Sequence, residues 1–190
     1  AGQGRHAEAE TLWRALVQEM PNDPGCLHGH ALSLLALQRH GEARALLERL
    51  VASWPDFLAA RLPLAHLLQH QFHQPQSALS LLLPALTTHP NHAGLQFAIG
   101  RARHDLLDPE GALVACERAI TLDPTSIEAY ATHGFCAHHV PAPDLDALRQ
   151  WLQDHAAALP RPVAPLARPR PAGADRPLRV AFLGMPAPLK

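Results

Sequence analysis

Histidine is the residue type whose number and spacing in this chain could do chemistry. The sequence of 190 residues contains 14 histidines, and His66, His70 and His73 stand at i, i+4 and i+7. A helix places the first two on one face, at the spacing of a two-histidine metal site. A carboxylate or third ligand at matching spacing is missing, and His73 falls where a turn is expected. We therefore predict solvated groove or turn histidines, with no metal and no cofactor.

Other catalytic patterns are missing from the sequence. It contains no Gly-rich phosphate loop, no GxSxG and no HExxH. Cys26, Cys116 and Cys136 have no CxxC spacing, which argues against a disulfide framework and against a zinc site built on cysteine. Because free cysteine packs as a small apolar residue, we predict inert, buried thiols in a reducing cytoplasm. We expect no enzymatic activity from this chain alone.

The elements that must position these residues follow an internal repeat. Four prolines recur at intervals of 34 or 35 residues: Pro21, Pro55, Pro90 and Pro124. Twelve residues before each proline stands a small residue: Ala9, Ala43, Ala78 and Ala112. A period near 34 with helix, turn, helix and then proline is the tetratricopeptide signature. The sequence therefore predicts an all-α, right-handed superhelical solenoid of antiparallel helix pairs.

The repeat also predicts the bounds of the helices. A half repeat at 5–19 precedes the helix pairs 25–37 with 40–52, 58–71 with 75–88, and 93–106 with 109–121. After each helix-ending proline we expect a cap for the next helix: Asp23, Asp56, Asn91, and Thr125 or Ser126. The turn of the third repeat is one residue longer than the others. Pro84 should remove a hydrogen bond from its helix and bend it.

Small residues are expected where paired helices approach each other. The first helices carry Ala31, Ala65, Gly100 and Gly134 at equivalent positions. Larger side chains, expected to fill the space between repeats, follow on the second helices: Trp13, Leu47, Leu82 and Cys116. This alternation reproduces the tetratricopeptide packing pattern.

The pattern changes toward the C-terminus. A fifth first helix is expected at 127–139, and an amphipathic helix at 144–159, with Leu145, Leu148, Trp151, Leu152, His155 and Leu159 near one face, should close the open end of the repeats. Residues 160–177 contain six prolines and predict an extended linker. Residues 178–190 open with a short apolar run typical of a buried parallel strand, so we expect the start of an α/β domain that the chain does not contain. Residues 1–159 form the predicted solenoid, about four and a half repeats with the closing helix.

The order of these parts resembles bacterial proteins of the O-linked N-acetylglucosamine transferase family of SPINDLY type. The resemblance rests on Arg149, Gln150, Trp151, Asp154, His155, Ala156 and Ala157 in the closing helix, and on Asp175 to Gly184 at the strand entry. It implies a repeat arm joined to a glycosyltransferase, and this chain stops before any catalytic residue of that family. The asparagine ladder of the family is missing, since Asn22 and Asn91 both fall in turns. Together with the missing initiator Met, the resemblance leads us to expect a fragment of a larger protein.

Charge and hydropathy limit the partners. Sixteen basic and seventeen acidic side chains give a formal net charge of −1, without the electrostatic footprint of a nucleic-acid or anionic-membrane binder. No apolar run is long enough to cross a membrane, and the N-terminus lacks the apolar core of a signal peptide.

The inner face of the first helices is the expected binding site, a groove for a protein or peptide. The predicted groove residues are His28, His66, Gln69, His70, Phe97, Arg101, His104, Asp105, Phe135 and His139. Such a surface binds through a few apolar anchors and polar contacts. An equally open interpretation is that Phe97 and the leucines of the inner face (Leu32, Leu35 and Leu62) only pack between repeats. Arg101 and Asp105 could pair across one helical turn.

These observations predict a cytoplasmic, peptide-binding scaffold that serves as the recognition arm of a larger glycosyltransferase-like protein. Two alternatives stay open: the arm of another fused enzyme, or a module for weak self-association through exposed half repeats. Histidines in the groove predict that binding changes between pH 5 and 7.

Overall fold

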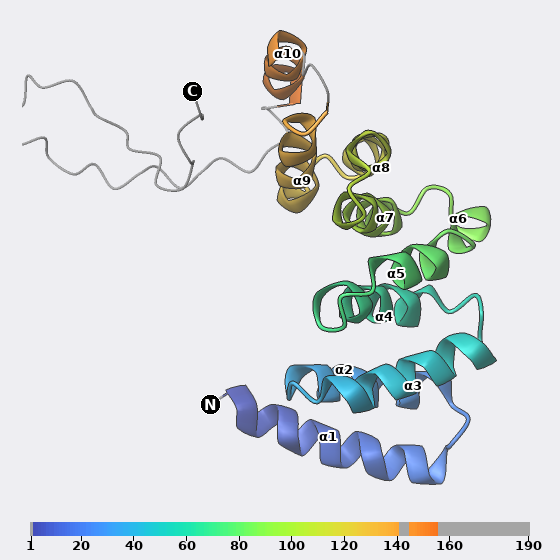
Figure 1. Cartoon of the computed structure of the whole chain (residues 1–190). Helices are drawn as coiled ribbons and strands as arrows, with labels where there is room; N and C mark the ends of the chain where they lie inside the picture. The colour runs from blue at the N-terminus through green and yellow to red at the C-terminus, as the bar shows by residue number, and fades with distance from the viewer. Residues whose placement is uncertain (1, 141–144, 156–190) are drawn as a thin grey trace, which may run out of the picture. The chain divides into compact units, whose positions relative to one another are not determined.

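The computed structural model of the protein describes residues 2–140 and 145–155, and within these ranges the regular elements are all helices (Figure 1). Their bounds are α1 Gly2–Glu19, α2 Pro24–Ala36, α3 His40–Ser53, α4 Leu58–His70, α5 Pro75–Leu82, α6 Ala85–Thr88, α7 Ala93–Asp105, α8 Pro109–Leu122, α9 Ile127–Ala137 and α10 Leu145–His155. The expected helices of the repeats are therefore present, with ends that differ by a few residues at most. The predicted linker and strand, and residues 156–159 of the closing helix, lie outside the described ranges.

Helices pack against their neighbours in sequence. Contacts join α1 to α2, α2 to α3, α3 to α4, α4 to α5, α5 to α7, α7 to α8 and α8 to α9, while α4 also meets α7 and α7 meets α9. The last two contacts bring first helices of successive pairs together. Side chains at i and i+4 on these first helices therefore form rows that continue from one pair to the next.

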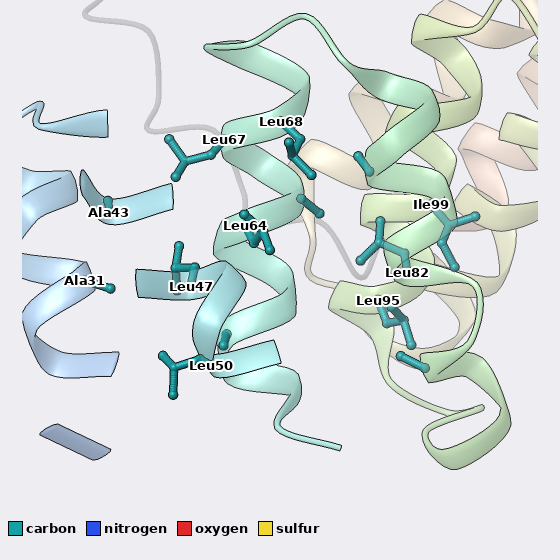
Figure 2. Packing of buried hydrophobic residues seen from close by; sticks show 14 of the residues in the cluster. Ala31, Ala43, Leu47, Leu50, Leu64, Leu67, Leu68, Leu82, Leu95 and Ile99 are labelled. Carbon is teal, nitrogen blue, oxygen red and sulfur yellow. The ribbon is translucent and has the colours of Figure 1, made fainter. Parts of the chain in front are cut away.

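The core lies between the helix pairs and is built mainly from leucine and alanine. Figure 2 shows Leu47 and Leu50 of α3 beside Leu64 of α4, with Leu82, Leu95 and Ile99 gathered where α5 meets α7. A separate cluster at the C-terminal end consists of Ala119, Ile120, Ala129 and Tyr130, with Phe97 and Trp151 packed against it. The predicted small residues Ala31, Ala43, Ala65, Ala78 and Ala112 are all fully buried.

Two glycines at equivalent repeat positions have different surroundings. A Cβ atom on Gly100 would lie 2.8 Å from Cys116 Sγ and 3.3 Å from the carbonyl oxygen of Ala112, so α7 and α8 approach closely there. A Cβ atom on Gly134 would meet nothing within 4 Å. The expected close approach therefore exists at Gly100, and at Gly134 the prediction is wrong, because no atom of the described residues would contact a Cβ atom there.

Helix capping follows the prediction at two of four boundaries. Asp23 Oδ1 accepts from the Cys26 amide at 2.7 Å, and Ser126 Oγ accepts from the Ala129 amide at 3.3 Å. Asp56 does not cap α4, which begins after Phe57 with no side-chain cap. Asn91 is also a wrong prediction, because His92 Nδ1 accepts from the Leu95 amide at 3.1 Å. Asn91 instead accepts a hydrogen bond from Arg118 of α8.

The turns within the helix pairs share a left-handed residue. Gln38, His73 and Leu107 have φ values of 62°, 51° and 60°. The amides of Gln38 and Leu107 donate to the third preceding residue, and the amides that follow them donate to the fifth preceding residue, which is the pattern of a Schellman motif. The turn at His73 has one more residue, as the sequence predicts, and its last amide bond reaches back six residues, from Gln74 to Leu68.

Two prolines interrupt helices in different ways. The helix predicted at 75–88 is divided into α5 and α6 at Leu83 and Pro84, so the predicted disturbance is confirmed as a break rather than a bend. Pro63 lies inside α4, and the helix continues through it. Pro63 stands in the second turn of α4, close to the end at which amides lack intrahelical acceptors.

Candidate functional site

The predicted groove residues lie on, or directly after, first helices of the pairs. His28 lies on α2; His66, Gln69 and His70 on α4; Phe97, Arg101, His104 and Asp105 on α7; Phe135 on α9; and His139 two residues after the end of α9. The helical spacing explains the rows within each helix, since His66 and His70, or Phe97, Arg101 and Asp105, repeat every four residues. The contacts of α7 with α4 and α9 bring these rows together.

A pocket of about 460 Å³, the polar pocket, lies between α7 and α9 and has both charged and apolar side chains in its lining. It is lined by Phe97, Arg101, His104, Asp105, Glu128, Ala131, Thr132 and Phe135. Five of these are in the predicted set. Glu128, Ala131 and Thr132 are not in that set, although the spacing of Ala131 and Thr132 from Glu128, at i+3 and i+4, and that of Phe135, at i+7, indicate one helix face.

An adjoining apolar pocket of about 420 Å³ is lined by His104, Leu107, Pro109, Phe135 and His139. His104 and Phe135 line both this apolar pocket and the polar pocket, so their rings lie at the boundary of the two pockets. Leu107 and Pro109 were not predicted. Leu107 is 89% exposed because its left-handed backbone directs the side chain out of the turn. A leucine in the sequence does not predict a left-handed conformation.

Phe135 forms the centre of this surface. Its ring meets His104 edge-on with centroids 5.0 Å apart, and it stacks on His139 at 4.5 Å with an interplanar angle of 30°. The side chain is nevertheless 55% exposed. An aromatic ring held by two neighbours and still open to solvent is a ready apolar contact for a ligand.

Arg101 is engaged on the side of α4. Its guanidinium carbon lies 5.6 Å from the centre of the Phe97 ring, and its Nη2 atom lies 3.4 Å from His70 Nδ1. The predicted pairing with Asp105 is wrong: Asp105 instead contacts His104 Nδ1 at 3.3 Å. Arg101 turns toward His70 because α4 supplies a nitrogen acceptor there, which a pattern within one helix does not reveal.

The α4 end of the surface carries two histidines in contact. The rings of His66 and His70 are 4.4 Å apart. Burial lowers the pKa of His66, with a further contribution from His70. Burial also lowers the pKa of His70, together with the charge of Arg101, so His70 favours the neutral form that accepts from the guanidinium.

A third pocket of about 410 Å³ extends the surface beside His70, lined by Gln69, His70, His73, Pro75 and Asp105. Gln69 is only 6% exposed, and its amide donates to the carbonyl oxygen of Ala98 at 3.2 Å, so it links α4 to α7. His28 stands apart from these three pockets, with its ring edge-on to Phe57 at 5.5 Å. No group of three or more His, Cys, Asp or Glu side chains within residues 2–140 and 145–155 is arranged to hold a metal ion.

No family model matches the sequence, and no curated protein matches it. Several solved structures do match it. MamA 41-end from Desulfovibrio magneticus RS-1 superposes with a TM-score of 0.70 at 20% identity, covering 82% of this chain and 86% of that one. A thermophilic TPR protein of Thermus thermophilus gives 0.57 at 24% identity, covering 82% and 91%. A double mutant of MamA from RS-1 gives 0.71 at 20% identity, covering 82% and 85%.

Among the described helices, none combines the length and the hydropathy needed to cross a membrane. The helix order, the buried small residues and the likeness to these structures agree with one another. At such low identities the likeness establishes the fold alone: this chain has the fold of tetratricopeptide-repeat proteins.

Proposed function

We propose that this chain is a protein- or peptide-binding scaffold whose ligand lies on the surface formed by α4, α7 and α9. The observation that carries the proposal is Phe135, which is 55% exposed at the boundary of two pockets. The predicted right-handed superhelical course of the helix pairs belongs to the same proposal, because it would present the first helices on one side.

The surface has the composition of a recognition site. Exposed aromatic and apolar groups (Phe135 and Leu107) are surrounded by charged and hydrogen-bonding groups (Arg101, Asp105, Thr132). Interfaces commonly place an aromatic anchor at the centre and polar groups at the rim. The three adjoining pockets suit an extended segment better than a compact small molecule, since they follow one another along three helices.

The finer part of the proposal concerns the parent protein. We infer that the scaffold is the recognition arm of a larger glycosyltransferase-like protein, and the support is the sequence of residues 149–184 alone. We place it in the cytoplasm because Cys26, Cys116 and Cys136 are free and buried, as suits a reducing compartment. A parent-gene continuation without alternating strands and helices, or a full-length protein that fails to bind a nucleotide sugar, would overturn this part without affecting the peptide-binding proposal.

Selection of a displayed library of random dodecapeptides on the whole chain tests the binding function. We expect enriched peptides whose affinity falls about tenfold or more in Phe135→Ala, because a central aromatic anchor is commonly worth about 2 kcal/mol of binding. The matched control is Leu12→Ala, which removes a 67% exposed side chain of α1. Thermal melts of both variants should stay close to wild type.

Two outcomes would contradict the proposal. The first is a library without enriched peptides, and the second is enriched peptides that bind Phe135→Ala as tightly as wild type. Light scattering over a concentration series tests the self-association alternative. That alternative predicts a molecular mass that rises with protein concentration, and a smaller rise in the variant Leu12→Ala.

A further inference from the structure

The two pockets that share Phe135 differ in chemistry. The polar pocket contains the carboxylates of Asp105 and Glu128 and the guanidinium of Arg101. The apolar pocket is lined by Leu107, Pro109 and the rings around them. A ligand that uses both pockets must therefore present one polar and one apolar side chain close together.

The charged side chains of the polar pocket sum to a negative charge, with Asp105 and Glu128 against Arg101. Glu128 is exposed and forms no ion pair with any residue in the described part of the chain. Asp105 contacts His104, and that contact is an ion pair only when His104 is protonated. With the histidines neutral, two carboxylates face the pocket against the single guanidinium of Arg101.

Arg101 does not neutralise these carboxylates by direct contact. Its guanidinium is placed over Phe97 and against His70, toward α4. Glu128 and Phe135 lie on α9, at the other wall of the pocket. The pocket therefore has a guanidinium and a carboxylate on its α7 wall, with the guanidinium directed toward α4, and Glu128 and Phe135 on its α9 wall.

The α9 side suits a cation from a ligand. A lysine ammonium or arginine guanidinium between α9 and α7 would approach the carboxylates of Glu128 and Asp105, and the 55% exposed ring of Phe135 can attract the same cation through its ring electrons. An acidic ligand would bring a third carboxylate into this space.

Resting on the proposed peptide-binding function, we propose that the α7–α9 surface selects a segment in which a basic residue stands beside, or two residues from, a bulky apolar residue. The basic side chain lies against Asp105 and Glu128, and the apolar one fills the pocket of Leu107 and Pro109. The short spacing follows because both pockets meet at Phe135, and an extended chain advances only about 3.3 Å per residue.

The sequences of the peptides enriched on the whole chain give the first test. We expect arginine or lysine adjacent to, or two positions from, leucine, methionine or phenylalanine. Acidic sequences, or sequences without a charge preference, would overturn this inference and leave the peptide-binding function standing. A library without any enriched peptide would overturn both.

Charge variants give the second test, measured by fluorescence anisotropy with the most enriched peptide. The nearly isosteric double variant Asp105→Asn, Glu128→Gln should weaken binding about fivefold and flatten its salt dependence, since exposed ion pairs are each worth up to about 1 kcal/mol. Arg101→Gln removes an opposing charge and should tighten binding. Glu48→Gln on α3 is the control and should change nothing. Weaker binding in Arg101→Gln together with tighter binding in the double variant would assign the surface to acidic peptides instead.

The apolar pocket is tested with Leu107→Asn. Residue 107 has φ 60°, a conformation that asparagine accepts more readily than leucine, so the variant keeps the fold. A library selected on Leu107→Asn should keep the preference for a basic residue and lose the preference for its apolar neighbour. Retention of the apolar preference would show that the second pocket is not used.

Discussion

At the scale of single residues, the most constrained charge in the described chain is Glu10. Its side chain is 5% exposed and receives hydrogen bonds from Arg14 at 2.5 and 2.6 Å and from Arg39 at 3.1 Å, with His30 Nε2 at 3.3 Å. The groups come from α1, α2 and the turn after α2. A buried carboxylate so surrounded ties the half repeat at the N-terminus to the first complete helix pair.

Glu10→Gln should destabilise the protein by about 1–3 kcal/mol, because hydrogen bonds to a charged group are worth roughly that much and a neutral amide replaces the charge. The control is Glu48→Gln, whose exposed pair with Arg44 spans one helical turn and should cost less than about 0.5 kcal/mol. Urea unfolding of both variants measures the difference. Equal effects would show that burial of Glu10 does not strengthen its ion pairs.

The same carboxyl group predicts an acid dependence. The hydrogen bond from Arg14 is the largest influence lowering the pKa of Glu10, and the charges of Arg14 and Arg39 add to it. Because the folded-state pKa lies below the unfolded-state value near 4.5, the contribution to stability is complete above that pH and is lost as the pH falls below it. Glu10→Gln should therefore show a shallower loss of stability below about pH 4.5. An unchanged slope would contradict the assignment.

At the scale of elements, helix approach distinguishes two glycines that the repeat treats alike. Gly100→Ala places a methyl group 2.8 Å from Cys116 Sγ and should destabilise the protein by about 1–3 kcal/mol. Gly134→Ala has open space and replaces a helical glycine, so it should stabilise by about 0.5–1 kcal/mol. Melting temperatures of the two variants should move in opposite directions, and a shift of the same sign would refute the difference in packing.

The periodicity of the sequence was sufficient to predict where the helices lie, but it predicted the contacts at and between the helices less well. The spacing of alanine and proline predicted helix bounds because a helix pair must repeat its small contact residues to stack. Caps at Asp56 and Asn91 were wrong because the helices begin one residue later than the preceding proline suggests. In the candidate site, the rows of residues at i and i+4 could be predicted from the sequence. The exposure of Leu107 could not, because it depends on a left-handed turn, and the orientation of Arg101 could not, because it depends on a histidine from another helix pair.

The last described helix is held by a stack of rings. Trp151 of α10 stacks with His133 of α9, at 4.0 Å and 19°, and with His155 of its own helix, at 4.4 Å and 30°. His133 is 4% exposed, and burial is the main cause that lowers its pKa, against the raising influence of Glu117. Protonation therefore favours the unfolded chain, in which histidine takes up its proton at higher pH.

His133→Phe keeps a ring against Trp151 and removes the titration. The wild-type protein should lose stability as the pH falls through about 6.5 toward the lower folded-state pKa, and the variant should lose less over the same interval. Glu117 on α8 and His155 on α10 are the charged groups that face His133, and both remain in the variant. Thermal melts at pH 7.5, 6.0 and 5.0 measure the effect, and parallel curves for the two proteins would refute it.

At the scale of the whole molecule, the described core consists of two clusters with separate aromatic supports. Trp54 packs against the large cluster that extends from Leu27 to Ala115, and Trp151 packs against the small cluster of Ala119, Ile120, Ala129 and Tyr130. Repeat proteins are stabilised by contacts between neighbouring units, so damage in one unit need not spread through the chain.

Trp151→Ala should consequently raise the hydrogen-exchange rates of amides in α9 while leaving those of α2, α3 and α4 near the wild-type values. Trp54→Ala is the matched substitution in the other cluster and should raise exchange in α3 and α4 before α9. Exchange measured by mass spectrometry on peptides from these helices distinguishes the two patterns. If either variant accelerates exchange equally in all four helices, the two clusters unfold as one cooperative unit, and stacking on Trp151 then supports the whole repeat array rather than its C-terminal end.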